Sequence, residues 1–217
     1  MDRLRAPGGC PWDAEQTHES LTRYLLEETY EVLEAIETAD PVLLREELGD
    51  LLLQVLFHAR IAAERTDDSA FTIDEVAGDL VDKLVRRHPH VFADADTGDA
   101  DQLNEAWEKQ KIAEKGRTSA VDGVPLSQPA LALAAKLTTR ARRAGLAVDV
   151  QPGQVGHPEQ VERPEPAGSD VQIGLRLLAV VEDAVTAGVD PEGALRRVTR
   201  ALRDGIRAAE ATGNDAD

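Results

Sequence analysis

The 217-residue chain contains little cysteine and few aromatic residues. A single cysteine, Cys10, excludes an intramolecular disulfide framework and is typical of a reducing compartment. Aromatic residues make up only 3% of the chain, whereas alanine, leucine, glutamate and arginine are abundant. This composition favours helices over the short strands of a β-sandwich or barrel. The sequence therefore predicts an all-α protein.

Basic residues are also scarce, because 24 Lys and Arg face 41 Asp and Glu, a net charge of −17. Such a charge argues against binding to nucleic-acid polymers or to anionic lipid. No apolar run approaches the ~18 residues of a membrane span, and the N-terminal stretch lacks the apolar segment of a signal peptide. We therefore expect a cytoplasmic protein that binds neither a nucleic-acid polymer nor a membrane.

Apolar residues recur at helical spacing throughout the first half of the chain, between residues that cap helices well. The run from Leu48 to Phe57 is apolar around most of the helix circumference, which predicts a central helix. The first expected helix runs from a cap at Asp13 or Thr17 to about Glu37, and the second from Pro41 to about Glu64. The third runs from a cap at Thr72, with Glu75 as its capping-box partner, to near His88. The fourth runs from Asp101 to about Glu114.

The composition changes after residue 116. Residues 117–148 read as a connector followed by a short helix from Ala130 to about Ala144. Residues 149–170 are rich in proline, glycine, glutamine and glutamate, which predicts a disordered linker because such a segment buries too little apolar surface to fold. Two helices are expected in the last segment, 171–217, from Val171 to Ala187 and from Pro191 to about Ala211, followed by a flexible tail.

The last segment is a faint copy of the second expected helix. Ile173-Gly174 and the apolar run after it match Leu48-Gly49 and the run that follows. In that register Gln172 and Leu175 replace the acids Glu47 and Asp50. We therefore expect a degenerate second helical repeat that has kept its apolar core and lost its carboxylates.

Four acids are spaced in two pairs on the first two helices: Glu28 with Glu31, and Glu47 with Asp50. Residues three apart share a helix face, and consecutive helices with a short turn are expected to be antiparallel neighbours. The two pairs then converge. Unpaired acids among apolar residues are costly, so a cation must face them. Hard oxygen donors without cysteine suit Mg²⁺, with Mn²⁺ as the alternative, and not zinc.

Cationic and aromatic side chains on the later helices complete this hypothesis. A cation that keeps several waters commonly holds substrate phosphates, which also require nearby positive charge. Lys83, Arg86 and Arg87 offer that charge, and Trp107 with Lys111 combines a flat ring and a cation one turn apart. The alternatives are a basic surface cluster and a tryptophan that packs in the core. Solvated surface charge is the favoured interpretation of Glu27, Glu34 and Glu46 taken singly.

Several motifs occur together in one order. Glu27-Glu28-x-x-Glu31 is followed by Glu47-x-x-Asp50, with GCPWDAEQTHESL before them and KLVRRHPHVF and Trp107-x-x-x-Lys111 after them. Over residues 1 to about 146 the chain closely resembles the MazG family of nucleoside triphosphate pyrophosphohydrolases. The resemblance implies a four-helix MazG-like bundle, a homodimer, and hydrolysis of nucleoside triphosphates to monophosphate and pyrophosphate. It also implies broad base tolerance and the removal of non-canonical nucleotides.

The resemblance further implies a role for each matching residue. Residues 1–116 would form the catalytic domain, and residues 171–217 a degenerate second MazG-like segment. Three alternatives remain: a narrow dUTP- or dCTP-type pyrophosphatase of the same fold, a (p)ppGpp hydrolase that uses the same site, and a non-catalytic helical adaptor. The implied Mg²⁺ ligands and catalytic residues are Glu28, Glu31, Glu47 and Asp50; Glu27 would lie in the same pocket, Lys83, Arg86 and Arg87 would contact the phosphates, and Trp107 and Lys111 would border the nucleotide.

Overall fold

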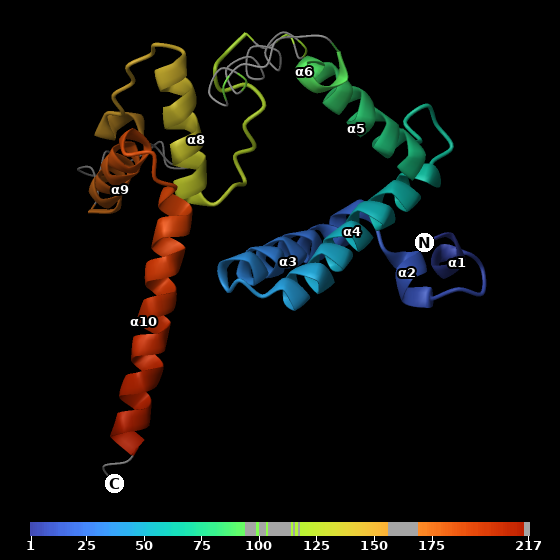
Figure 1. The fold of residues 1–217 in the computed structure, drawn as a ribbon, viewed down its shortest axis with the longest axis horizontal. Helices are drawn as coiled ribbons and strands as arrows, with labels where there is room; N and C mark the ends of the chain where they lie inside the picture. The colour runs from blue at the N-terminus through green and yellow to red at the C-terminus, as the bar shows by residue number, and fades with distance from the viewer. Residues whose placement is uncertain are drawn as a thin grey trace, which may run out of the picture. The chain divides into compact units, whose positions relative to one another are not determined.

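The computed structural model describes residues 1–93, 99, 103, 114, 116, 118–155 and 169–214. Every regular element in these ranges is helical and none is a strand, which confirms the predicted all-α class (Figure 1). None of the described helices is long and apolar enough to cross a lipid bilayer. The chain forms two compact units, Met1–Gln110 and Lys111–Asp217. The predicted domain boundaries at residues 116, 148 and 170 stay predictions.

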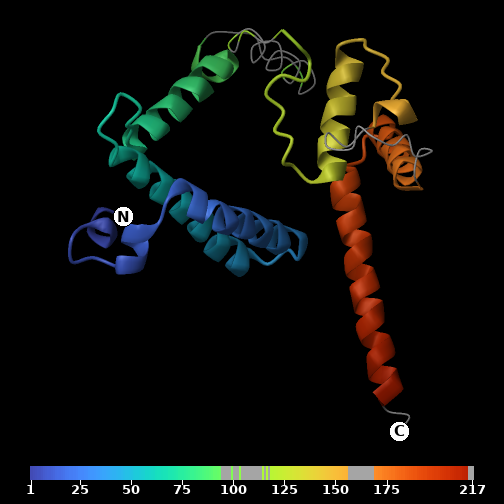
Figure 2. The same ribbon diagram turned by 180° about the vertical axis from the view of Figure 1, so that it is seen from behind.

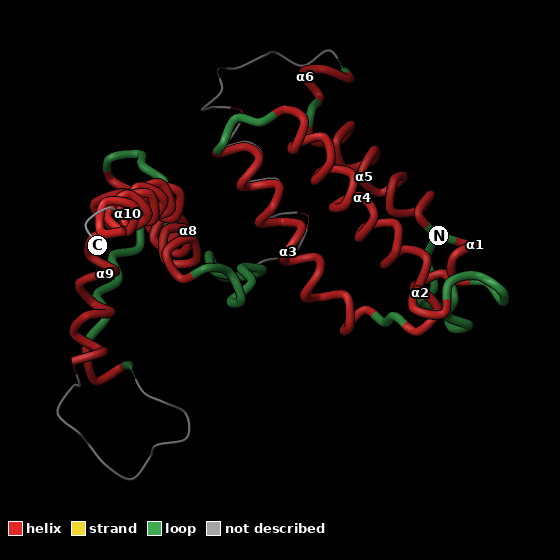
Figure 3. Tube along the Cα trace, turned by 90° about the horizontal axis from the view of Figure 1, so that it is seen from below, coloured by secondary structure: helices red, strands yellow, loops and turns green. Residues whose placement is uncertain are grey.

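The first unit is built on a pair of helices, α3 (His18–Glu37) and α4 (Pro41–Ala63), which lie side by side in Figures 1 and 3. The side chain of Thr17 accepts a hydrogen bond from the Ser20 amide and so begins α3. Asp40 caps α4 by accepting from the amides of Val42 and Leu43 at 2.9 and 3.1 Å. α3 therefore begins at the predicted cap Thr17 rather than at Asp13, and α4 begins at Pro41 as predicted.

Two short helices precede this pair: α1 (Asp2–Arg5) and α2 (Pro11–Glu15), which contains Asp13. They are joined by a tight turn in which a Cβ at Gly9 would lie 2.3 Å from the carbonyl oxygens of Arg3 and Leu4. Only glycine fits there without a shift of the backbone. This packing holds α1 and α2 close together.

After α4 the chain turns into α5 (Ile73–Arg87) and α6 (Pro89–Phe92). Thr72 begins α5 through a reciprocal capping box, because its amide donates to the Glu75 carboxylate at 2.7 Å and its hydroxyl accepts from the Glu75 amide at 3.4 Å. This confirms the predicted cap and the predicted end near His88. The helix expected over residues 101–114 lies almost wholly outside the described residues.

The burial of α4 differs from the expectation of a helix covered all round. Phe57, Ala59 and Ala62 are buried against its neighbours, but Leu48 and Leu52 are 49% and 55% exposed. The prediction of a central helix is therefore wrong for the single chain. The physical reason is that α3 covers one side of α4, and an apolar helix needs partners on several sides to be buried completely.

The second unit contains α8 (Ala130–Arg143), a short 3-10 turn η1 (Pro152–Gln154), α9 (Ser169–Thr186) and α10 (Pro191–Asn214) (Figure 2). α8 packs against α9. Arg140 donates to the carbonyls of Ala120 and Asp122 at 3.1 and 2.9 Å, which ties the preceding loop to α8. The predicted helices are present here, whereas most of the predicted linker, residues 156–168, lies outside the described ranges.

Candidate active site

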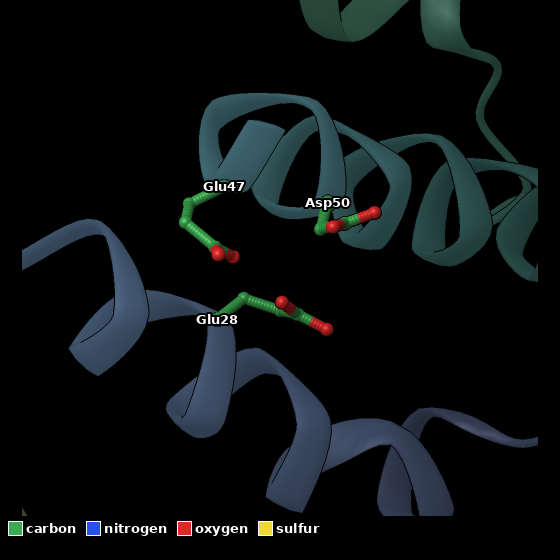
Figure 4. Close-up of side chains that lie close together, drawn as sticks. All are labelled: Glu28, Glu47 and Asp50. Carbon is green, nitrogen blue, oxygen red and sulfur yellow. The ribbon is translucent and has the colours of Figure 1, made fainter. Parts of the chain in front are cut away.

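Three carboxylates from two helices converge in the first unit. Glu28 on α3 and Glu47 and Asp50 on α4 each place a carboxylate oxygen within 4.8 Å of the others. Figure 4 shows the side chains directed into the space between the two helices. In the part of the chain that the structure describes, this is the only group of three or more metal-ligating side chains with such geometry. We call it the carboxylate cluster.

Local sequence explains why the cluster forms. Glu47 and Asp50 are three residues apart on α4 and therefore share a face, and the short turn at residues 38–40 brings that face against α3. Glu31 lies one turn from Glu28 on α3, with an exposed side chain. It hydrogen bonds to Glu28 but does not belong to the group of three. The sequence thus indicated the convergence of the acids, and Glu31 adjoins the carboxylate cluster at Glu28.

The surroundings of the carboxylate cluster disfavour the ionised forms of Glu28 and Glu47. Partial burial raises the pKa of Glu28, and the hydrogen bond and charge of Glu31, together with the charges of Asp50 and Glu47, raise it further. Desolvation is also the main cause that raises the pKa of Glu47, followed by the charges of Glu31, Glu46 and Asp50. A divalent cation would relieve this repulsion. An all-oxygen donor set of this size fits Mg²⁺ or Mn²⁺, which usually keep some water ligands.

The other candidate site residues do not belong to the carboxylate cluster. Glu27 is exposed on α3 and is not part of the carboxylate cluster. Lys83, Arg86 and Arg87 lie on the last turns of α5, and Figure 1 shows the far end of α5 well separated from the α3–α4 pair. Trp107 and Lys111 lie outside the described residues. The roles of all these side chains therefore stay predictions.

Two further polar residues of α4, Gln54 and His58, follow Asp50 by four and eight residues and so lie on the same helix face. Gln54 is 5% exposed, and its side-chain oxygen has no hydrogen-bond partner in the described part of the chain. The Nδ1 atom of His58 lies 2.8 Å from Nδ1 of His18 at the start of α3. The antiparallel register that sets Glu28 against Asp50 also sets His18 opposite His58. The contact between the two histidines therefore follows from the sequence once α3 and α4 are paired in that register.

The chain is similar to known proteins over the region that contains the carboxylate cluster. The family model described as the MazG nucleotide pyrophosphohydrolase domain matches residues 16–92, a span that includes the whole carboxylate cluster. The chain is also 40% identical to the Thermotoga maritima protein named nucleoside triphosphate pyrophosphohydrolase/pyrophosphatase MazG, over 97% of this chain and 82% of that protein. The chain belongs to the MazG family. The family and enzyme class that the motifs indicated are thereby confirmed.

Two other relatives match over the same length of this chain. An uncharacterized 26.1 kDa protein of Streptomyces cacaoi is 52% identical, over 97% of this chain and 79% of that protein. A nucleoside triphosphate pyrophosphohydrolase of Mycobacterium tuberculosis is 45% identical over 97% of this chain, which spans only 56% of that protein. MazG similarity therefore extends past the carboxylate cluster into the second unit.

Proposed function

We propose that this chain hydrolyses nucleoside triphosphates to nucleoside monophosphates and pyrophosphate with bound Mg²⁺, accepts several bases, and clears non-canonical nucleotides from the pool. The convergence of Glu28, Glu47 and Asp50 carries this proposal. The neighbouring carboxylates raise the pKa values of Glu28 and Glu47, so ionised acids are costly here without a bound cation, whereas a divalent cation converts that cost into binding energy. Membership in the MazG family and the names of two relatives support the reaction class.

Glu28, Glu47 and Asp50 would hold the metal, and Glu31 beside Glu28 would supply a further oxygen as the site fills. A bound divalent cation supplies charge neutralisation at the phosphates and lowers the pKa of a coordinated water. In the reaction, water oxygen bonds to the α-phosphorus and pyrophosphate leaves with the bonding electrons. A carboxylate of the cluster would accept the proton released by that water.

The negative triphosphate also needs positive charge, because the chain as a whole carries −17. We assign that role to Lys83, Arg86 and Arg87, with Trp107 and Lys111 at the nucleotide. A homodimer would bring the far end of α5 to a carboxylate cluster more readily than the single chain does. The exposed apolar residues Leu48 and Leu52 of α4 and Leu80 and Leu84 of α5 support such an assembly, since large exposed apolar patches mark interaction surfaces.

The test is pyrophosphate release with Mg²⁺ over the eight canonical nucleoside and deoxynucleoside triphosphates and (p)ppGpp, for the wild type and Asp50→Asn. We expect turnover of several nucleotides and a loss of more than ~100-fold in the variant, because removal of a supporting group alone costs a metal site ~10–100-fold. Asp68→Asn, an exposed loop acid of the same unit, is the matched control and should leave turnover unchanged.

A second measurement separates metal binding from turnover. Mg²⁺ at 100 times its Kd should raise the Tm of the wild type by roughly 5–10 °C, and Asp50→Asn should lose that shift. Turnover confined to dUTP or dCTP would support a narrow pyrophosphatase. Turnover confined to (p)ppGpp would support a (p)ppGpp hydrolase. A folded chain that binds no metal and releases no pyrophosphate would support the adaptor.

A further inference from the structure

Trp12 is a large aromatic side chain that is packed from one side and remains 48% exposed. Its ring meets Tyr24 of α3 at a centroid distance of 5.8 Å and an interplanar angle of 75°. It meets Phe57 of α4 at 6.3 Å and 86°. Phe57 itself is only 2% exposed. The aromatic cluster of Trp12, Tyr24 and Phe57 therefore has a buried base and an open tryptophan at the surface.

The backbone around Trp12 is fixed on both sides. The side-chain amide of Gln16 donates to the Trp12 carbonyl at 2.8 Å, and the Cys10 amide donates to the Leu4 carbonyl at 2.7 Å. Arg5 donates to the carbonyls of Asp13 and Gln16, which follow Trp12 on α2 and at its end. Little further ordering is needed when a ligand meets such a ring, which reduces the entropic cost of binding.

The aromatic cluster lies beyond one end of the carboxylate cluster. Tyr24 precedes Glu28 by four residues on α3, and Phe57 follows Asp50 by seven residues on α4, so each pair shares a helix face. These spacings correspond to about 6 and 10 Å along the helix axes. Because the helices are antiparallel, both steps lead in the same direction. A nucleotide whose phosphates lay at the carboxylates would have to cross this interval with its ribose to bring its base to the aromatic cluster.

The chemistry around the ring suits an anionic ligand with a flat apolar part. The exposed Arg23 places its guanidinium carbon 4.5 Å from the centroid of the Tyr24 ring and donates to the Tyr24 hydroxyl at 2.6 Å. This positive charge lies beside the aromatic cluster in a strongly acidic chain. Every nucleobase has a π-face that stacks on tryptophan, so this contact adds affinity without selecting one base.

We propose that Trp12 is the stacking surface for the base of the nucleotide whose phosphates lie at the carboxylate cluster. This inference rests on the proposed function and adds a residue of the GCPWD segment to the substrate site. It accounts physically for broad base tolerance, because the base would be held by its face rather than by hydrogen bonds to its edge. Trp12 thus contributes to nucleotide affinity, while the phosphate contacts are made elsewhere.

The experiment compares two ligands in the presence of Mg²⁺ on the full chain. One is a nucleoside triphosphate analogue with a non-hydrolysable bridge between the α- and β-phosphorus atoms, and the other is inorganic triphosphate, which has no base. Binding of both is measured by calorimetry for the wild type, Trp12→Leu and Trp12→Phe. Phe71→Leu, at an aromatic residue 41% exposed in a loop of the same unit, is the matched control. Thermal melts and sedimentation confirm fold and assembly.

Trp12→Leu should weaken the nucleoside analogue about tenfold or more and leave inorganic triphosphate unchanged. Trp12→Phe should recover most of the affinity, and Phe71→Leu should have no effect. Equal losses for both ligands, no loss for either, or a change of oligomeric state in Trp12→Leu with unaltered intrinsic affinity would each overturn the stacking role. If the wild type binds neither ligand, the proposed function itself fails and the inference falls with it.

Discussion

The Nδ1 atoms of His18 and His58 lie 2.8 Å apart, and the two imidazole rings are parallel to within 3°. Such a contact requires a single shared proton, because one nitrogen must donate and the other must accept. It joins the first turn of α3 to the last third of α4, at the opposite end of the helix pair from the loop at residues 38–40. A second proton at this contact would break it.

This pair predicts a pH dependence of stability. Partial burial, followed by the charge of His18, lowers the pKa of His58 below its usual value. The unfolded chain therefore binds more protons here than the folded chain, and the stability present above pH ~6.5 is lost as the pH falls from there toward the lower folded pKa. We expect the Tm to fall by a few degrees more between pH 7.5 and 5.5 in the wild type than in His58→Gln. Parallel profiles for the two proteins would contradict this.

Neutralising Glu28 should stabilise the metal-free chain. Because its folded pKa is raised, the carboxylate favours folding only when protonated, below its unfolded pKa, and that contribution is lost as the pH rises through the folded value. Glu28→Gln in EDTA at pH 7 should therefore melt higher than the wild type. The side chain is largely screened by solvent, so the gain stays below ~1 kcal/mol, or below about 4 °C in Tm.

The same melts in excess Mg²⁺ should show the opposite order, since the variant loses a metal oxygen. Glu15→Gln, an exposed acid of α2, serves as the control for removing one negative charge from the chain. A metal-free Glu28→Gln protein less stable than this control would show that the carboxylate cluster is not under electrostatic strain.

Replacing Gln54 with an apolar residue of similar length should stabilise the protein. Its side chain is 5% exposed and its oxygen has no hydrogen-bond partner in the described ranges, so the folded state carries the desolvation cost of that oxygen. Gln54→Met keeps the length and removes the polar atoms, and it should raise the free energy of unfolding by about 1 kcal/mol in urea titrations. A loss of more than ~1 kcal/mol would mean that the amide is satisfied in the folded protein.

Replacing Arg5 should lower the free energy of unfolding more than replacing any other arginine of the first unit. Its side chain is 5% exposed, and it pairs with Glu64 at 2.8 Å while donating to carbonyls at the end of α2. Arg5→Ala leaves those groups without a donor and should cost about 2–3 kcal/mol in chemical unfolding. Arg65 offers the comparison, because its pair with Asp67 is exposed on both sides. Arg65→Ala should cost less than ~0.5 kcal/mol, and similar losses for the two arginines would refute the distinction.

Leu52 tests the proposed homodimer. It lies on α4 with 55% of its surface exposed, and a charge there should prevent another chain from covering that face. We expect sedimentation equilibrium to show a dimer for the wild type and a monomer for Leu52→Glu at micromolar concentration. Leu126→Glu, at a residue 77% exposed in the second unit, should leave the assembly unchanged. A wild-type monomer would remove the dimer from the proposal.

Local patterns determined the helices of this protein. Thr17, Asp40 and Thr72 cap helices in the structure because their side-chain oxygens satisfy amides within three residues, a relationship that needs no tertiary contact. Spacing alone also indicated that Glu47 and Asp50 share a face and that Glu28 opposes them. The motifs around these acids were sufficient to indicate the MazG family.

Contacts between distant residues were decided only by the tertiary structure. The pairing of His18 with His58 and the packing of Trp12 on Phe57 depend on the axial register and rotation of α3 against α4. The divergence of the far end of α5 from the α3–α4 pair depends on the turn after α4 (Figure 1). A sequence pattern specifies which face of a helix is polar, but packing energies summed over many side chains determine what that face meets.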